Sequence, residues 1–389
     1  MNMSEMISPV VRNIPPSGIR KFFDLINEMK DAISLSIGEP DFDTPWNVRE
    51  AGIYSLEKGH THYSPNAGFA ELKEEIARYM KRKNGVEYDY KKQILVTVGG
   101  SEAIDLALRS LVSPGDEVII PEPSFVAYKP CAVLAGACPV IIELKAENQF
   151  RLMPEQLENA ITPRTKVLFL PYPNNPTGAI MPKEDLDRIV EVLKNKNIVI
   201  ISDEIYAELT YAGKHISIAS YPDMKDKTLV INGFSKAYAM TGWRLGFACG
   251  HPDLIAAMTK IHQFAIMCAP TTAQHAAIEA LRNSDKDIEA MTREYNRRRR
   301  MMIDGFTKAG LKCFEPLGAF YVFPSITSTG ISSNEFCERL LMEERVAVVP
   351  GTAFGNCGEG FVRACYASSV DNISEAMSRI HRFVKKYAK

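Results

Sequence analysis

Short apolar runs, several of them rich in valine and isoleucine, recur along the chain from residue 94 onward and alternate with stretches of helical pattern. Runs of this length and composition are typical of buried strands. The strand candidates begin at residues 94, 117, 139, 166, 198, 228 and 245. Regular alternation of strands and helices predicts an α/β fold in which helices cover a mostly parallel sheet. Periodicity alone leaves the order of the strands open.

This alternation ends near residue 285. A chain of 389 residues is too long for one small core, so we expect a large and a small domain. We assign residues 46–285 to the large domain and 286–389 to a small C-terminal α+β domain, with 1–45 as an N-terminal segment that is part of the small domain. Further helices are expected at Ser17–Lys30, Phe69–Lys83, Lys286–Lys308 and Asp371–Tyr387, and further strands within Gly318–Ser325 and Val346–Val349.

One lysine and one arginine stand in an otherwise uncharged stretch that follows the strand candidate at residue 228. The stretch Asn232–Gly246 reads NGFSKAYAMTGWRLG and contains Lys236 and, eight positions later, Arg244. A lone lysine after a strand is most often a solvated surface residue. Here the neighbours are apolar or small, which disfavours the ammonium form and makes the amine nucleophilic. Lys236 is therefore a candidate for a Schiff base with a carbonyl compound.

A candidate anion site lies where the strand Gln93–Val98 leads into a helix that begins with GGSE at residues 99–102. Unpaired backbone N–H groups at a helix start can bind an anion. A simple capped helix is the more common explanation of such a stretch. Because the chain has neither a Walker A lysine here nor a G-x-G-x-x-G turn, the expected guest is a phosphate monoester rather than a nucleotide.

Three other polar residues have both a ligand-binding and a structural explanation. Asp203 follows the apolar run Ile198–Ser202. Ligands bind at the carboxyl ends of parallel strands in α/β proteins, so Asp203 is either a ligand contact or the cap of a following helix. Asn175 precedes a proline in a turn, which favours extended geometry and permits a cis bond. Arg363 lies in an apolar, strand-like run, where a charge is costly without an anionic partner. That partner is either an acidic side chain or a bound anion.

Three stretches carry a family resemblance: SIGEPDFDTP near the start, NGFSKAYAMTGWRLG in the middle and GEGFVRACYASS near the end. Together they resemble the fold-type I pyridoxal-phosphate (PLP) enzymes, specifically the class-I aminotransferases of the prokaryotic aspartate and aromatic branch. The resemblance covers nearly the full length, with the motifs in the family's order. It implies a large PLP-binding domain with a seven-stranded sheet that contains one antiparallel strand, and a homodimer with shared active sites.

The resemblance also implies a role for each candidate residue. Lys236 would hold the cofactor as a Schiff base and later move the Cα proton, and Asp203 would pair with the pyridine nitrogen. Tyr206 and Asn175 would donate hydrogen bonds to the phenolic oxygen. The other implied cofactor contacts are the stacking ring of Phe125 and the phosphate ligands Gly100, Ser101, Glu102, Ser235, Arg244 and, across the dimer interface, Tyr63. The implied substrate contacts are Gly38, Phe125, Asn175 and Arg363, whose planar fork suits an α-carboxylate.

Two positions bear on how far the resemblance extends. Many relatives have a serine, bound to phosphate, three residues before the Schiff-base lysine, whereas this chain has Gly233. One phosphate contact is then missing or is taken over by Ser235. Some aspartate-preferring relatives have a lysine at the position of Ser101. Its absence, together with Phe125, favours aromatic or broad specificity over a preference for aspartate, and an acetylated diaminopimelate substrate stays open.

Composition argues against several other classes of function. With 46 basic and 47 acidic residues the formal net charge is −1, which provides no global field for nucleic acid or an anionic membrane. Acidic residues flank the run Arg297–Arg300, so we expect a solvated helix face there. The eight cysteines form no C-x-x-C pair, and His60 and His62 lack partners at ligand spacing, so no metal is expected. Without a secretory signal or a run of about 20 apolar residues, a cytoplasmic protein is expected.

The leading interpretation is therefore a PLP-dependent aminotransferase that acts on small-molecule substrates, an amino acid and a 2-oxo acid such as 2-oxoglutarate. The amino donor would be aromatic, acidic or otherwise bulky. A PLP-dependent cysteine-S-conjugate β-lyase is the alternative, because both reactions begin with the same carbanion. The effector domain of a transcription regulator is disfavoured, since residues 1–45 carry no helix-turn-helix pattern.

Overall fold

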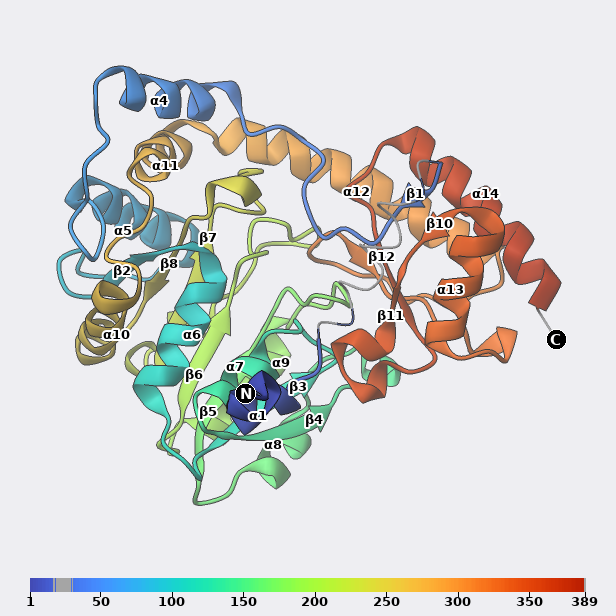
Figure 1. The fold of residues 1–389 in the computed structure, drawn as a ribbon, viewed down its shortest axis with the longest axis horizontal. Coiled ribbons are helices and arrows are strands. Elements are labelled where there is room, and N and C mark those ends of the chain that lie inside the picture. The colour runs from blue at the N-terminus through green and yellow to red at the C-terminus, as the bar shows by residue number, and fades with distance from the viewer. Residues whose placement is uncertain (17, 19–28, 30, 388–389) are drawn as a thin grey trace.

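The computed structural model describes residues 1–16, 18, 29 and 31–387. Apart from residues 18 and 29, the helix expected at Ser17–Lys30 lies outside the described residues. Figure 1 shows a large body built on one sheet and, beside it, a smaller body formed mainly by the C-terminal third of the chain.

The large body contains a seven-stranded sheet, and every strand expected from the sequence is confirmed within one residue of its predicted start. The strands are β2 (Ile94–Thr97), β3 (Glu117–Glu122), β4 (Cys138–Glu143), β5 (Thr165–Leu170), β6 (Val199–Asp203), β7 (Thr228–Gly233) and β8 (Gly246–Cys249). Their order is β2-β8-β7-β6-β5-β3-β4, and β8 runs antiparallel to both of its neighbours. The mostly parallel sheet with one antiparallel strand is thus confirmed.

Helices cover both faces of this sheet (Figure 1). Successive strand residues point to opposite faces, so the apolar strands form two separate layers of core. One layer packs against α6 (Gly99–Leu111), α7 (Tyr128–Leu134) and α10 (Pro252–Ala265). The other packs mainly against α5 (Ala70–Asn84), α8 (Pro154–Ala160), α9 (Lys183–Leu193) and α11 (Thr271–Asn283). The outlying α4 (Trp46–Glu57) lies along α11.

The smaller body has its own core and two small sheets. Strands β11 (Val349–Pro350), β12 (Val362–Cys365) and β9 (Tyr321–Val322) form an antiparallel sheet in that order. The N-terminal strand β1 (Ile33–Ser34) pairs in parallel with β10 (Val346–Ala347). Helices α12 (Asp285–Lys308), α13 (Ser333–Glu344) and α14 (Val370–Tyr387) complete this part. Leu35 belongs to the same core cluster as residues from 291 to 384, so both ends of the chain contribute to it.

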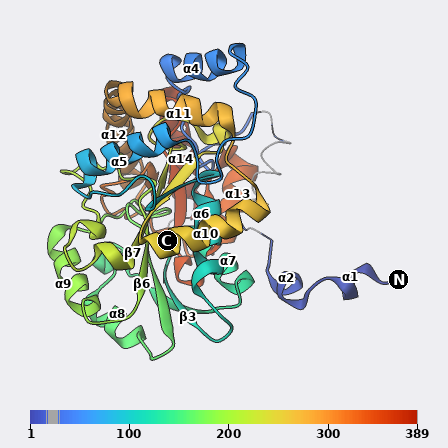
Figure 2. The same cartoon turned by 90° about the vertical axis from the view of Figure 1, so that its left-hand side faces the viewer.

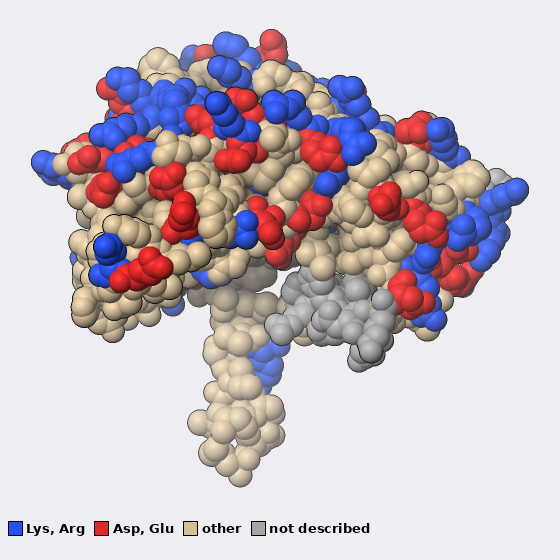
Figure 3. All heavy atoms as spheres, turned by 90° about the horizontal axis from the view of Figure 1, so that it is seen from above, with Lys and Arg blue, Asp and Glu red and all other residues tan. Residues whose placement is uncertain are grey.

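The chain begins with two short helices, α1 (Met3–Met6) and α2 (Pro9–Asn13). They form an arm that projects from the body (Figures 2 and 3). In the view of Figure 3, basic and acidic side chains are interspersed over the surface. Among the described residues, no helix is both long enough and apolar enough to span a membrane.

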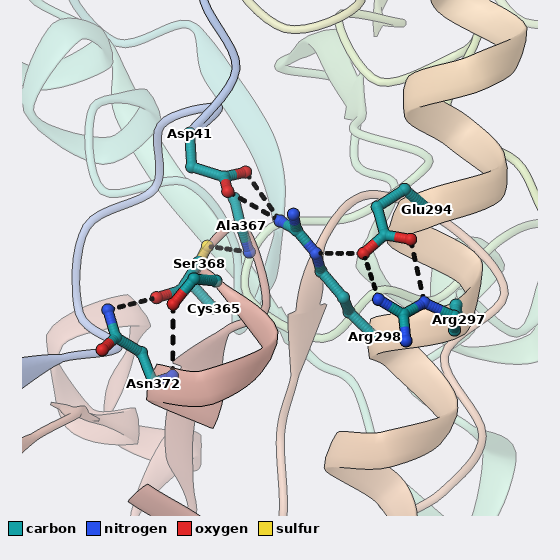
Figure 4. A network of polar contacts seen from close by, with 9 residues as sticks. Asp41, Glu294, Arg297, Arg298, Cys365, Ala367, Ser368 and Asn372 are labelled. Carbon is teal, nitrogen blue, oxygen red and sulfur yellow. Dashed lines mark hydrogen bonds and ion pairs between the residues drawn. The ribbon is translucent and has the colours of Figure 1, made fainter. Parts of the chain in front are cut away.

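The expected solvated face at Arg297–Arg300 is wrong for two of the four arginines. Arg298 and Arg299 are buried, with side chains 8% and 5% exposed. The Arg298 Nη1 atom lies 2.8 Å from both carboxylate oxygens of Asp41, and Nε lies 2.9 Å from Glu294 (Figure 4). Consecutive residues of an α-helix point about 100° apart, so four in a row cannot all face solvent. Arg298 instead ties α12 to the loop that carries Asp41, whereas Arg299 binds Glu315 and the Pro316 carbonyl oxygen.

Candidate active site

One cavity of about 300 Å³ lies where the large sheet meets the smaller body. The residues that line it come from the carboxyl ends of the parallel strands, the start of α6, the small antiparallel sheet and the loop at residues 38–39. They are Gly38, Glu39, Gly100, Ser101, Ile104, Phe125, Tyr128, Pro171, Pro173, Asn175, Asp203, Ile205, Tyr206, Ser235, Lys236, Thr241, Arg244, Tyr321 and Arg363. All but two of the site residues expected from the sequence are among them. The two exceptions are Glu102 and Tyr63.

Lys236 follows β7 and places its amine inside this cavity. Its Nζ atom donates a hydrogen bond to the Gly38 carbonyl oxygen, at 2.7 Å. Burial lowers the pKa of Lys236 to about 8, partly offset by nearby acidic groups. At pH 7 about one amine in ten is then neutral, against fewer than about one in a thousand for an ordinary lysine. The cavity therefore holds a lysine that can act as a nucleophile and as a base.

Asp203 ends β6 and is almost fully buried. Its carboxylate accepts a hydrogen bond from the Tyr128 hydroxyl at 2.7 Å and one from the Ile205 backbone N–H at 3.2 Å. Burial raises the pKa of Asp203, and these two hydrogen bonds oppose the rise. A buried carboxylate of this kind is stabilised by a cationic ligand group. No sequence signal singled out Tyr128, although it ends the EPSFVAY stretch whose phenylalanine, Phe125, lies edge-on to it at 5.6 Å.

Arg363, on β12, is a buried cation without an acidic partner among the residues that the structure describes. Its side chain donates to the Ser36 carbonyl oxygen at 2.5 Å and to Asn175 Oδ1 at 3.0 Å. The Nε atom is buried and has no hydrogen-bond partner. Of the two partners left open by the sequence, the acidic side chain is therefore not found. An anion that entered the cavity would supply the missing charge and the missing acceptor.

The opposite end of the cavity has the groups expected to bind an anion. Gly100 and Ser101 lie in the first turn of α6, where backbone N–H groups lack partners within the helix. The guanidinium of Arg244 lies beside this turn, because a Cβ added to Gly99 would come within 2.9 Å of Nη2. Ser235 also lines this cavity.

For Glu102 the structure excludes a direct side-chain contact with a ligand in this cavity. Its carboxylate accepts a hydrogen bond from the Val98 backbone N–H at 2.5 Å and lies 2.7 Å from Nδ1 of His262. The side chain is thus engaged in capping the helix start. Because α6 begins at Gly99, the Glu102 backbone N–H is the first one that pairs within the helix, so it is not among the unpaired N–H groups of the helix start. Spacing alone could not distinguish these two uses of one residue.

The structure explains why position 233 carries no side chain. Gly233 pairs with Gly246 across β7 and β8. A Cβ at position 233 would lie 2.9 Å from Gly246 Cα and 3.0 Å from the Leu245 carbonyl oxygen, both of them backbone atoms. A serine here would therefore force the strands apart. Ser235, which does line the cavity, is the hydroxyl available in this segment.

Tyr63 lies away from the cavity in this single chain. It is 81% exposed, in the loop between α4 and α5. This loop is tied to the segment after α10: Asn66 Nδ2 donates to the Met267 carbonyl oxygen and Thr271 Oγ1 donates to the His62 carbonyl oxygen, each at 2.7 Å. The tyrosine is thus presented on the surface of the molecule.

Comparisons with known proteins agree with this geometry. A sequence profile described as "Aminotransferase class I and II" matches residues 30–380. A putative aminotransferase, YugH, of Bacillus subtilis is 50% identical over 99% of this chain and 100% of its own, and an aspartate aminotransferase of Pyrococcus abyssi is 45% identical over 96% and 97%. The crystal structure of an aromatic aminotransferase from Pyrococcus horikoshii superposes with a TM-score of 0.90 at 43% identity, covering 94% of this chain and 99% of that one. The chain belongs to the class I and II aminotransferases, which are PLP-dependent enzymes.

Proposed function

We propose that this aminotransferase takes the amino group from aromatic or other bulky, uncharged amino acids and passes it to a 2-oxo acid such as 2-oxoglutarate. The single observation that best supports a site for amino acids is the buried Arg363, which lacks an acidic partner in the described structure and lies in the same cavity as Lys236. The cavity thus offers a reactive amine and a carboxylate-binding cation together.

The residues present fit PLP, a phosphate ester with an aldehyde and a pyridine ring. We propose that Lys236 bonds to the aldehyde carbon and that Asp203 pairs with the pyridine nitrogen, whose positive charge would compensate the buried carboxylate. Tyr206 and Asn175 would contact the phenolic oxygen, and Phe125 would stack on the ring. The phosphate would be held by the backbone of Gly100 and Ser101 and by the side chains of Ser235 and Arg244. When bound, PLP supplies the electron sink for the breaking Cα–H bond.

The side chains would then position the substrate and move its proton. Arg363 would bind both oxygens of the α-carboxylate, and Gly38 leaves room for the substrate beside it. This orientation sets the Cα–H bond toward the amine of Lys236, which is positioning catalysis. Once the amino group of the substrate has taken the place of Lys236 at the aldehyde carbon, the freed amine would accept the proton from Cα, since a large share of it is neutral near pH 8.

The preference for uncharged side chains rests on the cations available in the cavity. Among the described residues that line it, the basic side chains are Lys236, Arg244 and Arg363. These three would bind the aldehyde, the phosphate and the α-carboxylate, so no basic lining residue of the same chain remains for the side-chain carboxylate of aspartate. Ser101 contributes no charge. Apolar pockets discriminate only modestly, so several bulky donors are expected to react.

This proposal is tested by mixing the PLP-loaded enzyme with one amino acid at a time under single-turnover conditions. We expect phenylalanine or tyrosine to convert the cofactor to its amino form at least about tenfold faster than aspartate, since an unpaired buried charge costs more than about 1.4 kcal/mol. Addition of 2-oxoglutarate should reverse the change. A preference for aspartate would contradict the substrate proposal, and release of pyruvate and ammonia from cysteine conjugates would indicate a β-lyase.

We further propose that the enzyme is a cytoplasmic homodimer in which Tyr63 reaches the phosphate site of the other copy. The support is a group of exposed apolar side chains beside the loop that carries Tyr63. Phe264 is 84% exposed, and Ile266 and Met267 are about half exposed; the Met267 carbonyl oxygen accepts the hydrogen bond from that loop. The purified enzyme should sediment at twice the chain mass of 43.4 kDa. Sedimentation as a single chain at micromolar concentration would contradict the shared site.

A further inference from the structure

Tyr321 is a cavity residue to which neither the sequence analysis nor the proposed mechanism gives a role. It lies on β9, is 1% exposed and lines the cavity. In the antiparallel pairing of β9 with β12, it stands opposite Cys365. Arg363 is two residues from Cys365 and therefore shares a face of the sheet with Tyr321 as its diagonal neighbour.

The first contact of Tyr321 is with Tyr206. Their hydroxyl oxygens lie 2.8 Å apart, and their rings meet edge-on at 5.8 Å. Burial raises the pKa of both tyrosines, so both are neutral and each hydroxyl carries one proton. The shared hydrogen bond uses one of these two protons. If Tyr321 donates it, the proton of Tyr206 is left for an acceptor in the cavity.

The second contact of Tyr321 is with Arg363. The guanidinium carbon lies 4.6 Å from the centre of the Tyr321 ring and 4.8 Å from that of Phe354. A cation at this distance from an aromatic ring is attracted to it, and the attraction is strongest where water is excluded. The ring thus helps to hold a buried cation that lacks an acidic partner in the described chain.

The third contact of Tyr321 is with the loop at Gly38. A Cβ added to Gly38 would overlap the Tyr321 hydroxyl, so this position admits only glycine while the tyrosine is in place. The Gly38 carbonyl oxygen accepts the hydrogen bond from Lys236. The Tyr321 side chain therefore touches three groups with proposed roles: Tyr206 for the phenolic oxygen, Arg363 for the α-carboxylate and Gly38 beside the substrate.

We propose that Tyr321 is a positioning residue for this reaction: its hydroxyl donates to Tyr206 and turns the Tyr206 proton toward the cofactor, while its ring holds Arg363 for the substrate carboxylate. The proposal rests on the function proposed above. It assigns separate tasks to the hydroxyl and to the ring, so the two can be removed one at a time.

The hydroxyl is tested with Tyr321→Phe by following the visible absorbance of the PLP-loaded enzyme as a function of pH. A donor to the phenolic oxygen stabilises its deprotonated form, and Tyr206 donates better when it also accepts a hydrogen bond. Loss of the Tyr321 hydroxyl should therefore raise the pH midpoint of the absorbance change, by roughly half a unit. A lower midpoint would mean that Tyr206 donates to Tyr321, and an unchanged midpoint would mean that the Tyr321 hydroxyl does not act through Tyr206; either result would overturn the proposal.

Two comparisons separate this role from a general loss of packing. In a Tyr206→Phe background, Tyr321→Phe should leave the midpoint unchanged, because its effect passes through Tyr206. An equal shift in that background would contradict the proposal. The matched control is Tyr366→Phe: Tyr366 is buried and donates to the Ala319 carbonyl oxygen at 3.1 Å, but is not among the lining residues of the cavity. The Tyr366→Phe variant should lose a hydroxyl without a change in the pH midpoint of the absorbance. A shift of this midpoint as large as that of Tyr321→Phe would also contradict the proposal.

The ring is tested through KM for the amino acid. Tyr321→Phe keeps the ring and should change KM by less than about twofold, whereas Tyr321→Leu should raise it roughly three- to thirtyfold. Equal KM values for the two variants would overturn the role of the ring. If the Tyr321→Leu variant does not fold, the absorbance test of Tyr321→Phe still tests the role of the hydroxyl. If the wild-type enzyme shows no cofactor absorbance, the proposed function fails. If the wild-type absorbance changes with pH and Tyr321→Phe has the same midpoint, only the role of Tyr321 fails.

Discussion

Replacing Lys236 by alanine is expected to lower kcat by about 10⁴-fold or more while leaving the protein folded. The amine is proposed both to bond to the cofactor aldehyde and to carry the proton, and general acid–base catalysis alone contributes up to about 10⁴-fold. Alanine removes a buried amine whose pKa is lowered to about 8 by desolvation, so folding should not suffer. Single-turnover transamination and the visible absorbance of bound cofactor measure the two roles separately.

The matched control is Lys260→Ala, on α10, where the lysine is exposed and lies outside the cavity. This variant should keep wild-type absorbance and wild-type kcat. A Lys236→Ala enzyme that retained more than about one-hundredth of the wild-type kcat would show that another group moves the proton. The assignment of Lys236 would then be wrong.

Replacing Arg363 by leucine is expected to lower kcat/KM for amino acids by between about 30-fold and several thousandfold. Removing one partner from a buried, charged hydrogen-bonded pair costs about 2–5 kcal/mol, and each 1.4 kcal/mol is a factor of ten. The substitution also leaves the Ser36 carbonyl oxygen and Asn175 Oδ1 without their donor. Arg363→Lys should recover only part of the loss, because lysine lacks the planar fork that binds two oxygens.

Arg300→Leu serves as the control, since Arg300 is exposed on α12 and is not among the lining residues. It should leave kcat/KM within about twofold of the wild type, as surface substitutions usually have small effects. The cofactor absorbance of Arg363→Leu should resemble that of the wild type, because the arginine is assigned to the substrate. An unchanged KM for the amino acid in Arg363→Leu would show that the α-carboxylate binds elsewhere.

Several parts of the fold and the site followed from local sequence. The seven apolar runs predicted the strands of the large sheet, and residues that follow the strands lie together at their carboxyl ends, as α/β topology requires. The uncharged surroundings of Lys236 predicted a desolvated amine, and the lowered pKa agrees. The isolated charge of Arg363 pointed to an anionic partner, although the sequence left its nature open.

Other features depended on contacts between distant parts of the chain. Of the two inner arginines of the run at 297–300, Arg298 is buried against Asp41, and Arg299 is buried against Glu315 and Pro316. Glu102 turns its carboxylate to His262, which lies 160 residues away. Tyr128 and Tyr321 enter the site through partners far along the chain, Asp203 and Tyr206. Their own neighbours in sequence gave no signal that separated them from ordinary core tyrosines.

The sequence by itself determined where the strands of the large sheet lie and which lysine is desolvated, because periodicity and charge act over a few residues. Its motifs also carried the family resemblance. The tertiary structure alone decided that Arg363 has no acidic partner in the described chain, that Glu102 lies against His262 and that Tyr321 touches Tyr206, Arg363 and the Gly38 loop. The physical reason is that hydrogen bonds and ion pairs act over a few ångströms. Only the packing of the whole chain brings residues that are tens to hundreds of positions apart within that range.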